Sequence, residues 1–311
     1  MLVYLYILPL ALIIDLVIGE YPAFLHPVTW IGNIISFLLK AAPGKGATLQ
    51  FLYGVVMVVF TVILFTAPVV FLLIYLRDWS TIGFIIVAAI LLKSTFSIRT
   101  LYKLANNVKR LLDERKLSAA RKETSYLVSR DTRKLNREQI TSAIVEMETE
   151  SITDSLVAPL FYWLIFGVPG AIAYRVINTF DSRIGYYGKY EYTGKFAAIL
   201  DDILNFVPAR LAGLLLVVSA YIARKNGRKA WRTLLSDHGK TASPNAGWTM
   251  SAAAGALGVR LEKPGHYRLG HTGKEPDSSS ISGGLRLVMV TCLLWCCVCI
   301  GIMGVRYALT T

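Results

Sequence analysis

The chain has 311 residues, of which 54% are hydrophobic and only 17% are charged, and its mean hydropathy is +0.51. Lys and Arg outnumber Asp and Glu by 33 to 20, which gives a net charge of +13. No RNA-binding motif or DNA-reading module accompanies this charge. The composition therefore weighs against a nucleic-acid partner and indicates a membrane protein with bases in its cytoplasmic loops.

Apolar runs recur along the chain at lengths that suit membrane helices. The clearest is residues 51–76, because a helix of that length exceeds a hydrocarbon core of about 30 Å. Further candidate spans lie at residues 1–18, 82–92 and 285–305. Residues 156–174 and 203–223 contain Pro with Gly or Arg inside apolar sequence, which predicts broken or re-entrant helices. The N-terminus lacks a basic region and a cleavage site, which favours a retained segment over a signal peptide.

Charged segments separate these runs and predict which side of the membrane they face. Residues 93–137 contain 13 Lys and Arg and residues 224–240 contain six more, so the positive-inside rule places both in the cytoplasm. Leucines at helical spacing predict helices in the first region, with a turn at residues 113–116. Residues 278–284 are rich in Ser and Gly, which predicts a flexible tether to the last span.

The predicted fold is all-α, a polytopic integral membrane protein with cytoplasmic helical and loop insertions. We interpret residues 1–311 as a single membrane-embedded domain. Its insertions are a basic helical one at residues 93–155 and a polar loop region at residues 224–284. We expect several passes through the cell membrane, with the functional site on the cytoplasmic side.

Acidic clusters beside the apolar runs are the strongest functional signal, since carboxylates near a bilayer cost free energy unless they have a role. Glu146, Glu150 and Asp154 recur every four residues, so on a helix they form one acidic stripe that excludes Glu148. Such a stripe suits a divalent cation or a basic partner. Taken alone, it is more typical of a solvated helix face.

A second group of oxygen-bearing side chains follows. Asn178 and Asp181 are three residues apart, as are Asp202 and Asn205, and Asp201 precedes the second pair. These groups suit Mg²⁺, which takes one or two carboxylates together with substrate phosphates. Helix capping is the alternative for each pair by itself.

Other polar residues are candidate binding groups. Arg130 and Arg210 carry the guanidinium fork that favours phosphate or carboxylate, and Arg210 lies inside an apolar run, where it needs a partner. Ser243 and Asn245 lie in a polar turn before a small-residue run, whose first N–H groups suit an anion; a simple turn and N-cap is the alternative. A lone histidine such as His26 is more often packed than a ligand. No P-loop motif occurs, so any ATP site is of another kind.

These residues lie in motifs that resemble the adenosylcobinamide-phosphate synthase family, the membrane proteins of cobalamin biosynthesis. The motifs run in order through most of the chain: Asp15 with His26-Pro27-Val-Thr-Trp-Ile-Gly32, Val128-Ser-Arg130-Asp131-Thr132, Glu146 through Asp154 with Ala158-Pro-Leu-Phe161, Gly167-Val-Pro-Gly170, Asn178-Thr-Phe-Asp181-Ser, Gly185-Tyr186, Asp201-Asp202 to Pro208-Ala-Arg210, Ser243-Pro-Asn-Ala-Gly247 and Lys263-Pro-Gly-His-Tyr-Arg-Leu-Gly270. Where the family commonly has Asn and Gly, this chain has Ser151 after Glu150 and Ser155 after Asp154. The carboxylates are kept, whereas the Asn amide is absent from this position.

The resemblance implies an ATP-dependent amide ligation that joins aminopropanol or its phosphate to the free propionate of adenosylcobyric acid. It implies Mg²⁺ as cofactor, ATP as co-substrate and an acyl phosphate intermediate. The residues expected at the ATP site are Asn178, Asp181, Asp201, Asp202, Asn205 and Arg210, with Asp181, Asp201 and Asp202 on the metal. The expected catalytic residues are Glu146, Glu150, Asp154 and Arg130. The residues expected to bind substrate are His26, Ser243 and Asn245.

Two other functions fit parts of the pattern. A transporter or binding protein for a corrinoid or another amphipathic anion would need charges midway along its spans, whereas here they gather at span ends and in loops. A structural subunit would tolerate substitution of its acids. The sequence leaves open whether the amine is phosphorylated, and whether the chain forms a homo-oligomer or associates with other enzymes of the pathway.

Overall fold

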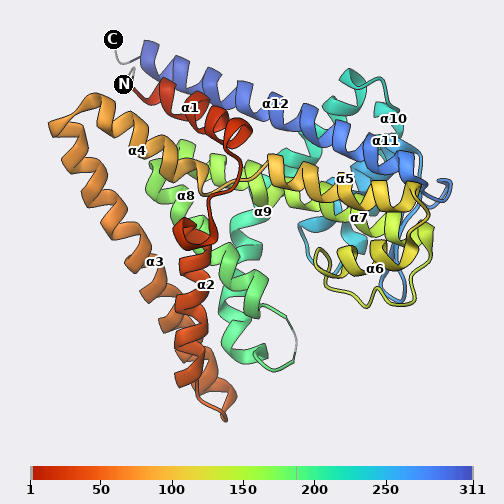
Figure 1. The fold of residues 1–311 in the computed structure, drawn as a ribbon, viewed down its shortest axis with the longest axis horizontal. Helices are drawn as coiled ribbons and strands as arrows, with labels where there is room; N and C mark the ends of the chain where they lie inside the picture. The colour runs from red at the N-terminus through yellow and green to blue at the C-terminus, as the bar shows by residue number, and fades with distance from the viewer. Residues whose placement is uncertain (1–2, 187, 310–311) are drawn as a thin grey trace. The chain divides into compact units, whose positions relative to one another are not determined.

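The computed structural model describes residues 3–186 and 188–309, and it is built almost entirely from helices (Figure 1). The helices are α1 (Tyr4–Val17), α2 (Pro27–Leu38), α3 (Ala47–Trp79), α4 (Thr81–Lys93), α5 (Arg99–Asp113), α6 (Leu117–Ser125), α7 (Arg137–Ile152), α8 (Ala158–Ile184), α9 (Glu191–Ile222), α10 (Gly227–Asp237), α11 (Ala246–Leu257) and α12 (Ser278–Ala308). The strands β1 (Leu261–Lys263) and β2 (Tyr267–Leu269) pair antiparallel and form the one sheet of these described residues. The prediction of an all-α protein is confirmed.

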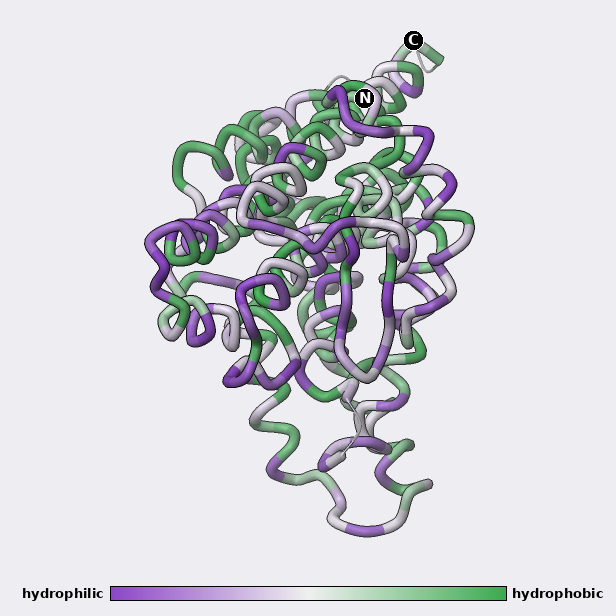
Figure 2. The backbone as a smooth tube through the Cα atoms, turned by 90° about the vertical axis from the view of Figure 1, so that its right-hand side faces the viewer, coloured by the Kyte–Doolittle hydropathy of each residue, from purple (hydrophilic) through white to green (hydrophobic). Residues whose placement is uncertain are grey.

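Four helical stretches of the described chain are long and apolar enough to cross a membrane. They are α3, α9, α12 and the continuous stretch Arg137–Ile184, which contains α7 and α8. At 33 residues, α3 is about 50 Å long, and most of its side chains are exposed, as a helix surrounded by lipid requires. Figure 2 shows long hydrophobic stretches of backbone alternating with shorter hydrophilic ones. The expected spans at residues 51–76 and 285–305 lie inside α3 and α12.

The chain divides into two compact units, a division that the sequence analysis did not anticipate. The first unit consists of Met1–Ser97, Ala158–Asn205 and Val298–Thr311. Within it, α1 packs against α4, and α8 packs against both α2 and α3 (Figure 1). One of its buried apolar clusters contains Ile31, Ile35, Met57, Val58, Val176, Ile177, Phe180, Ile184 and Ala197.

The helix α8 is interrupted at Gly167. This residue has a φ of +69°, a backbone conformation that glycine adopts without the steric cost of a Cβ, and Pro169 follows it. The expectation that residues 156–174 do not form a straight helix is therefore confirmed. Arg306 in the last turn of α12 donates a hydrogen bond to the carbonyl oxygen of Leu164, three residues before the interruption.

The second unit, Ile98–Val157 and Phe206–Cys297, contains a helical core and the hairpin. The predicted helices and the turn between them are confirmed by α5 and α6. The region 224–284, which was expected to form loops, also contains α10 and α11. Small residues allow α11 to lie close to α10, since a Cβ on Gly255 would overlap the α10 backbone. This close approach explains why the sequence there is rich in Ala and Gly.

Residues 278–284 are not a flexible tether, so that prediction is wrong. They form the first turns of α12, and the backbone N–H of Ser280 donates to the Asp277 carboxylate at 3.1 Å. Gly284 packs so tightly that a Cβ on it would overlap the carboxyl group of Glu148 on α7. The glycine therefore serves close helix packing rather than chain flexibility.

We predict that Gly54→Ala destabilises the protein. Gly54 in α3 faces the backbone of Thr193 in α9, and a Cβ there would overlap the Thr193 carbonyl oxygen. Overpacking typically costs about 1–3 kcal/mol, so the midpoint of thermal unfolding in detergent should fall. The control is Gly301→Ala in α12, where nothing lies within 4 Å of the added Cβ. Equal midpoints for the two variants would contradict the close contact of α3 with α9.

Candidate functional site

Glu146 on α7 is the centre of a buried polar cluster in the second unit. Its carboxylate, in a residue only 1% exposed, accepts hydrogen bonds from Ser142 Oγ at 2.6 Å and from the Tyr267 hydroxyl at 2.7 Å. The Arg130 guanidinium pairs with the same carboxylate. Ser142 Oγ in turn accepts from the backbone N–H of Glu262 at 2.7 Å. One carboxylate thus joins α7 to the hairpin and to the segment before α7.

The negative charge of Glu146 keeps its two hydrogen-bond donors, Arg130 and Tyr267, protonated. Burial acts to lower the pKa of Arg130, but the negative charge of Glu146 outweighs it and raises that pKa. Burial and the charge of Glu146 both raise the pKa of Tyr267. Arg130 therefore stays cationic and Tyr267 stays protonated. Glu146 is occupied by these partners and serves first to orient Arg130.

The predicted acidic stripe does not continue as a regular α-helix. The α-helix ends at Ile152 and is followed by a π-helical turn over Thr153–Val157, so Asp154 departs from the spacing that the stripe assumed. Glu150 is exposed and Asp154 is half-buried, while Glu146 is buried. The three acids thus lie in different environments. Single π-helical turns of this kind are frequent at functional sites.

Glu148 is a buried acid that sequence reasoning set aside. It is fully buried against Gly284, and among the described residues neither of its carboxyl oxygens has a hydrogen-bond partner. A charged carboxylate in such a place costs free energy. The spacing on α7 showed that Glu148 leaves the stripe, but spacing alone cannot reveal what covers it.

A second cluster joins α8 to α9 within the first unit. The two oxygens of the Asp201 carboxylate accept from Asn178 Nδ2 at 3.3 Å and from Asn205 Nδ2 at 2.9 Å. The Tyr174 hydroxyl donates to Asn205 Oδ1 at 2.9 Å. All four residues are buried, so the hydrogen bonds replace the water that these polar groups lose. Three of the residues expected at an ATP site are therefore brought together.

Arg175 extends this cluster, and sequence reasoning missed it. Its Nη1 donates to Asn178 Oδ1 at 2.9 Å, and its Nε donates to the carbonyl oxygen of Thr95 at 2.8 Å. The signal was present, since an arginine three residues before an asparagine on one helix lies beside it. It was overlooked because Arg175 stands at the end of an apolar run rather than inside an acidic motif.

Asp181 and Asp202 lie near members of the second cluster in sequence, three residues after Asn178 and next to Asp201, and both are half-buried. The carboxyl group of Asp181 lies against Gly185, where a Cβ would overlap it. The described residues contain no group of three or more His, Cys, Asp or Glu side chains arranged around a metal position. Carboxylates such as Asp181 and Asp202 still suit Mg²⁺, because this ion needs only one or two protein carboxylates when substrate phosphates complete its coordination shell.

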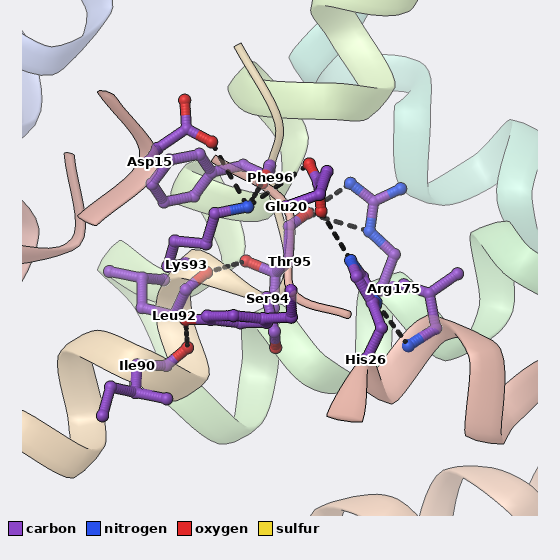
Figure 3. A network of polar contacts seen from close by, with 12 residues as sticks. Asp15, Glu20, His26, Ile90, Leu92, Lys93, Ser94, Thr95, Phe96 and Arg175 are labelled. Atoms are coloured by element: carbon purple, nitrogen blue, oxygen red, sulfur yellow. Dashed lines mark hydrogen bonds and ion pairs between the residues drawn. The ribbon is translucent and has the colours of Figure 1, made fainter. Parts of the chain in front are cut away.

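His26 belongs to a third cluster, which surrounds a buried lysine in the first unit (Figure 3). Lys93 has no exposed surface, and its Nζ lies 3.2 Å from the Asp15 carboxylate and 3.3 Å from the Glu20 carboxylate. The carbonyl oxygen of Phe96 accepts a third, longer hydrogen bond at 3.5 Å. His26 Nε2 lies 2.6 Å from the other oxygen of Glu20. The lysine is thus a buried cation enclosed by acceptors.

The hydrogen bonds of His26 identify its tautomer. Its Nδ1 accepts from the backbone N–H of Val28 at 3.2 Å and caps α2, so this nitrogen carries no proton. The proton is therefore on Nε2, which donates to Glu20. Burial by itself raises the pKa of Glu20, but the hydrogen bond from His26 and the charge of Lys93 outweigh it and lower the pKa to about 2.

Arg210 has the partner that its apolar surroundings require. Its Nη1 donates to the carbonyl oxygen of Phe206 at 2.6 Å and to Asn245 Oδ1 at 3.3 Å, and its guanidinium lies 3.4 Å from the centroid of the Phe206 ring. The Arg210 guanidinium also lies over the Trp248 ring, 4.8 Å from its centroid. Ser243 Oγ accepts from the backbone N–H of Asn245 at 3.2 Å, so the predicted polar turn before α11 is confirmed.

The expected site residues thus fall into separate groups. The first unit holds Asn178, Asp181, Asp201, Asp202 and Asn205, and also His26 in the cluster around Lys93. The second unit holds Arg130, Glu146, Glu150 and Asp154, and also Arg210, Ser243 and Asn245. Sequence reasoning found most members of each group but missed Arg175, Lys93 and Tyr267, which complete the hydrogen bonds.

Comparison with known proteins identifies the family. A family model described as CobD/Cbib protein matches residues 8–305. The chain belongs to the CobD/Cbib family. It is 50% identical to a cobalamin biosynthesis protein CobD from Dehalococcoides mccartyi, over 94% of this chain and 95% of that one.

Archaeal relatives of the CobD/Cbib family extend this match. A probable cobalamin biosynthesis protein CobD from Methanothermobacter thermautotrophicus is 42% identical over 96% of this chain and 97% of its own. A probable cobalamin biosynthesis protein CobD from Pyrococcus furiosus is 40% identical over 91% of this chain and 93% of its own. No solved structure gives a significant match. The resemblance drawn from the motifs is thereby confirmed, and the chain is a cobalamin biosynthesis protein of this family.

We predict that Glu20 makes the protein acid-sensitive. Because its pKa is lowered in the folded state, its contribution to stability is present above the ordinary pKa of 4.5 and is lost as the pH falls towards about 2. Glu20→Gln should remove this part of the pH dependence of the thermal unfolding midpoint. Glu275→Gln, at a carboxyl that is 64% exposed, is the control. A Glu20→Gln protein with the same acid slope as the wild type would contradict the cluster.

Proposed function

We propose that this protein is an ATP-dependent amide ligase that joins aminopropanol, or its phosphate, to the free propionate of adenosylcobyric acid. Membership of a cobalamin biosynthesis family supports a corrinoid substrate. The observation that carries the proposal is the group of carboxylates and amides on α8 and α9, where Asn178, Asp201 and Asn205 are hydrogen-bonded and Asp202 adjoins them. Such a concentration of oxygen donors suits a magnesium-bound nucleotide.

The proposed reaction has two steps. A carboxylate is a poor acyl electrophile, so an oxygen of the propionate first attacks the γ-phosphorus of ATP, which gives an acyl phosphate and releases ADP. The amine nitrogen then attacks the acyl carbon, loses a proton and displaces inorganic phosphate. The acyl phosphate hydrolyses in water, so the site has to exclude solvent between the steps.

The first unit supplies the nucleotide site in this proposal. Asp181 and Asp202 are the half-buried carboxylates that would hold Mg²⁺, together with Asp201. When bound, Mg²⁺ neutralises charge on the phosphates. Both oxygens of Asp201 accept hydrogen bonds from asparagine amides, which fixes the orientation of the carboxylate.

The second unit holds the remaining expected residues, whose proposed roles follow from the family resemblance. Glu150, exposed at the end of α7, would take the proton from the amine, with Asp154 nearby in sequence on the π-helical turn. Arg130, oriented by Glu146, carries a guanidinium that would bind a phosphate or carboxylate group of the substrate. Arg210, Ser243 and Asn245 would bind an anionic group of substrate or nucleotide, and His26 in the first unit would bind substrate.

The location of the buried ion pair in the first unit supports a ligase over a transporter. Asp15 lies in the last turn of α1, and Lys93 is the last residue of α4, so this ion pair is at helix ends. A transporter site would place such charges midway along its spans. The basic segments of residues 93–137 and 224–240 support an active site on the cytoplasmic side of the cell membrane.

We predict that Asp202→Asn abolishes most amide formation while leaving the protein folded. The loss should be at least as large as the ~10- to 100-fold that follows removal of a residue supporting a metal site. Full-length protein in detergent would be incubated with the corrinoid acid, ATP, Mg²⁺ and either amine, and the product weighed by mass spectrometry. Asp131→Asn is the control, since this exposed acid pairs with Arg133 at the surface.

The two ways in which this experiment can fail are distinguishable. Full activity of Asp202→Asn would overturn the nucleotide site but not the ligase. Absence of amide product from the wild-type protein with both amines would overturn the ligase itself.

A further inference from the structure

The short helix α10 has two faces of different character. Its buried face carries Gly227, Ala230, Thr233, Leu234 and Asp237. Its exposed face carries Arg228, Trp231, Arg232 and Leu235. At 100° per residue these four side chains fall within an arc of about 100°. Two arginines and two apolar side chains therefore share one stripe of the surface.

The buried face fixes how α10 sits in the second unit. Ala230 and Leu234 belong to an apolar cluster with residues of the second half of α9, of α11 and of α12. Figure 1 shows α10 beside α11. Asn226 caps the helix by accepting from the backbone N–H of Lys229 at 2.8 Å. The exposed stripe is thus presented by a helix that is anchored on its other side.

The exposed stripe has no acidic side chain to balance its arginines. Residues 224–240 contain six bases and one acid, Asp237. That acid is on the opposite face, 4% exposed, and its carboxylate already binds Lys240 Nζ at 2.5 Å and the backbone N–H of Gly270 at 2.8 Å. The parts of α9, α11 and α12 within this unit contain no Asp or Glu. The positive charge of the stripe is uncompensated by the elements that hold it.

An apolar surface leads directly to this stripe. The last turns of α9, a helix apolar enough to cross a membrane, expose Val218, Tyr221 and Ile222. The Tyr221 ring lies so close to Gly227 that a Cβ there would overlap it, which brings the end of α9 against the start of α10. Trp231 and Leu235, 42% and 52% exposed, continue the apolar surface.

We infer that the exposed stripe of α10 lies on a bilayer surface and binds anionic lipid headgroups. Trp231 and Leu235 enter the boundary between headgroups and acyl chains, where tryptophan is favoured. Arg228 and Arg232 contact the lipid phosphates. A soluble anion would use the arginines but not the two apolar side chains, and a purely apolar partner would bury two arginines without a counter-charge, which costs free energy. Anionic lipid satisfies both, as it does for basic segments next to membrane spans.

The first test measures lipid binding by the full-length protein. Native mass spectrometry of detergent-solubilised protein would be used to titrate phosphatidylglycerol and, in parallel, phosphatidylcholine. Each arginine near the surface should contribute about fivefold to phosphatidylglycerol affinity, so Arg228→Gln with Arg232→Gln should lower it by more than tenfold. Lys122→Gln with Lys134→Gln removes the same charge from exposed positions elsewhere and is the control. Equal losses in the two double variants would overturn the proposal.

The second test locates Trp231 in the bilayer. The protein would be reconstituted into vesicles of phosphatidylcholine and phosphatidylglycerol with acyl chains brominated near the headgroup, which quench nearby tryptophan fluorescence. The difference between wild type and Trp231→Phe isolates this residue. Strong quenching of that difference signal is expected. A Trp231 signal that is insensitive to brominated lipid but quenched by aqueous acrylamide would overturn the proposal, and would point to a water-exposed helix available to a soluble partner.

Discussion

An ammonium group without contact to solvent constrains the polar architecture of the first unit. Lys93 would be too costly to bury alone, and the structure encloses it with Asp15, Glu20 and the carbonyl oxygen of Phe96. These acceptors come from α1, from the segment that follows it and from the turn after α4. The chain must therefore turn closely after Lys93, and this turn presents the carbonyl oxygen of Thr95 to Arg175.

The same requirement links that ion pair to the proposed nucleotide site. Arg175 donates hydrogen bonds to the carbonyl oxygen of Thr95 and to the side chain of Asn178, and Asn178 donates one to Asp201. Each buried polar group along this route is satisfied by the next, so substitution of one leaves its neighbour without a partner. In the second unit Glu146 has the corresponding place, because it satisfies donors from three separate segments.

Much of the fold was predictable from residues 51–76 and from the basic segments, since length and charge decide which helices enter a membrane. Acids such as Asp201 could be recognised because they stand out in apolar sequence. Tyr267 could not be recognised from the sequence, because its partner Glu146 lies 121 positions away and no local sequence pattern reveals such a distant contact. The π-helical turn also escaped prediction, since packing rather than propensity selects it. Gly284 was misread because a glycine that permits flexibility and one that permits close packing look alike in sequence.

The hydrogen bond from Arg306 to the carbonyl oxygen of Leu164 ties the last turn of α12 to α8. Hydrocarbon offers no donor to a peptide oxygen, whereas the Leu164 oxygen before the α8 interruption accepts from a side chain in the last turn of α12. That turn is consequently part of the folded structure rather than a dispensable tail. Trimming the protein before Arg306 would remove a hydrogen-bond donor to α8 that lipid cannot replace.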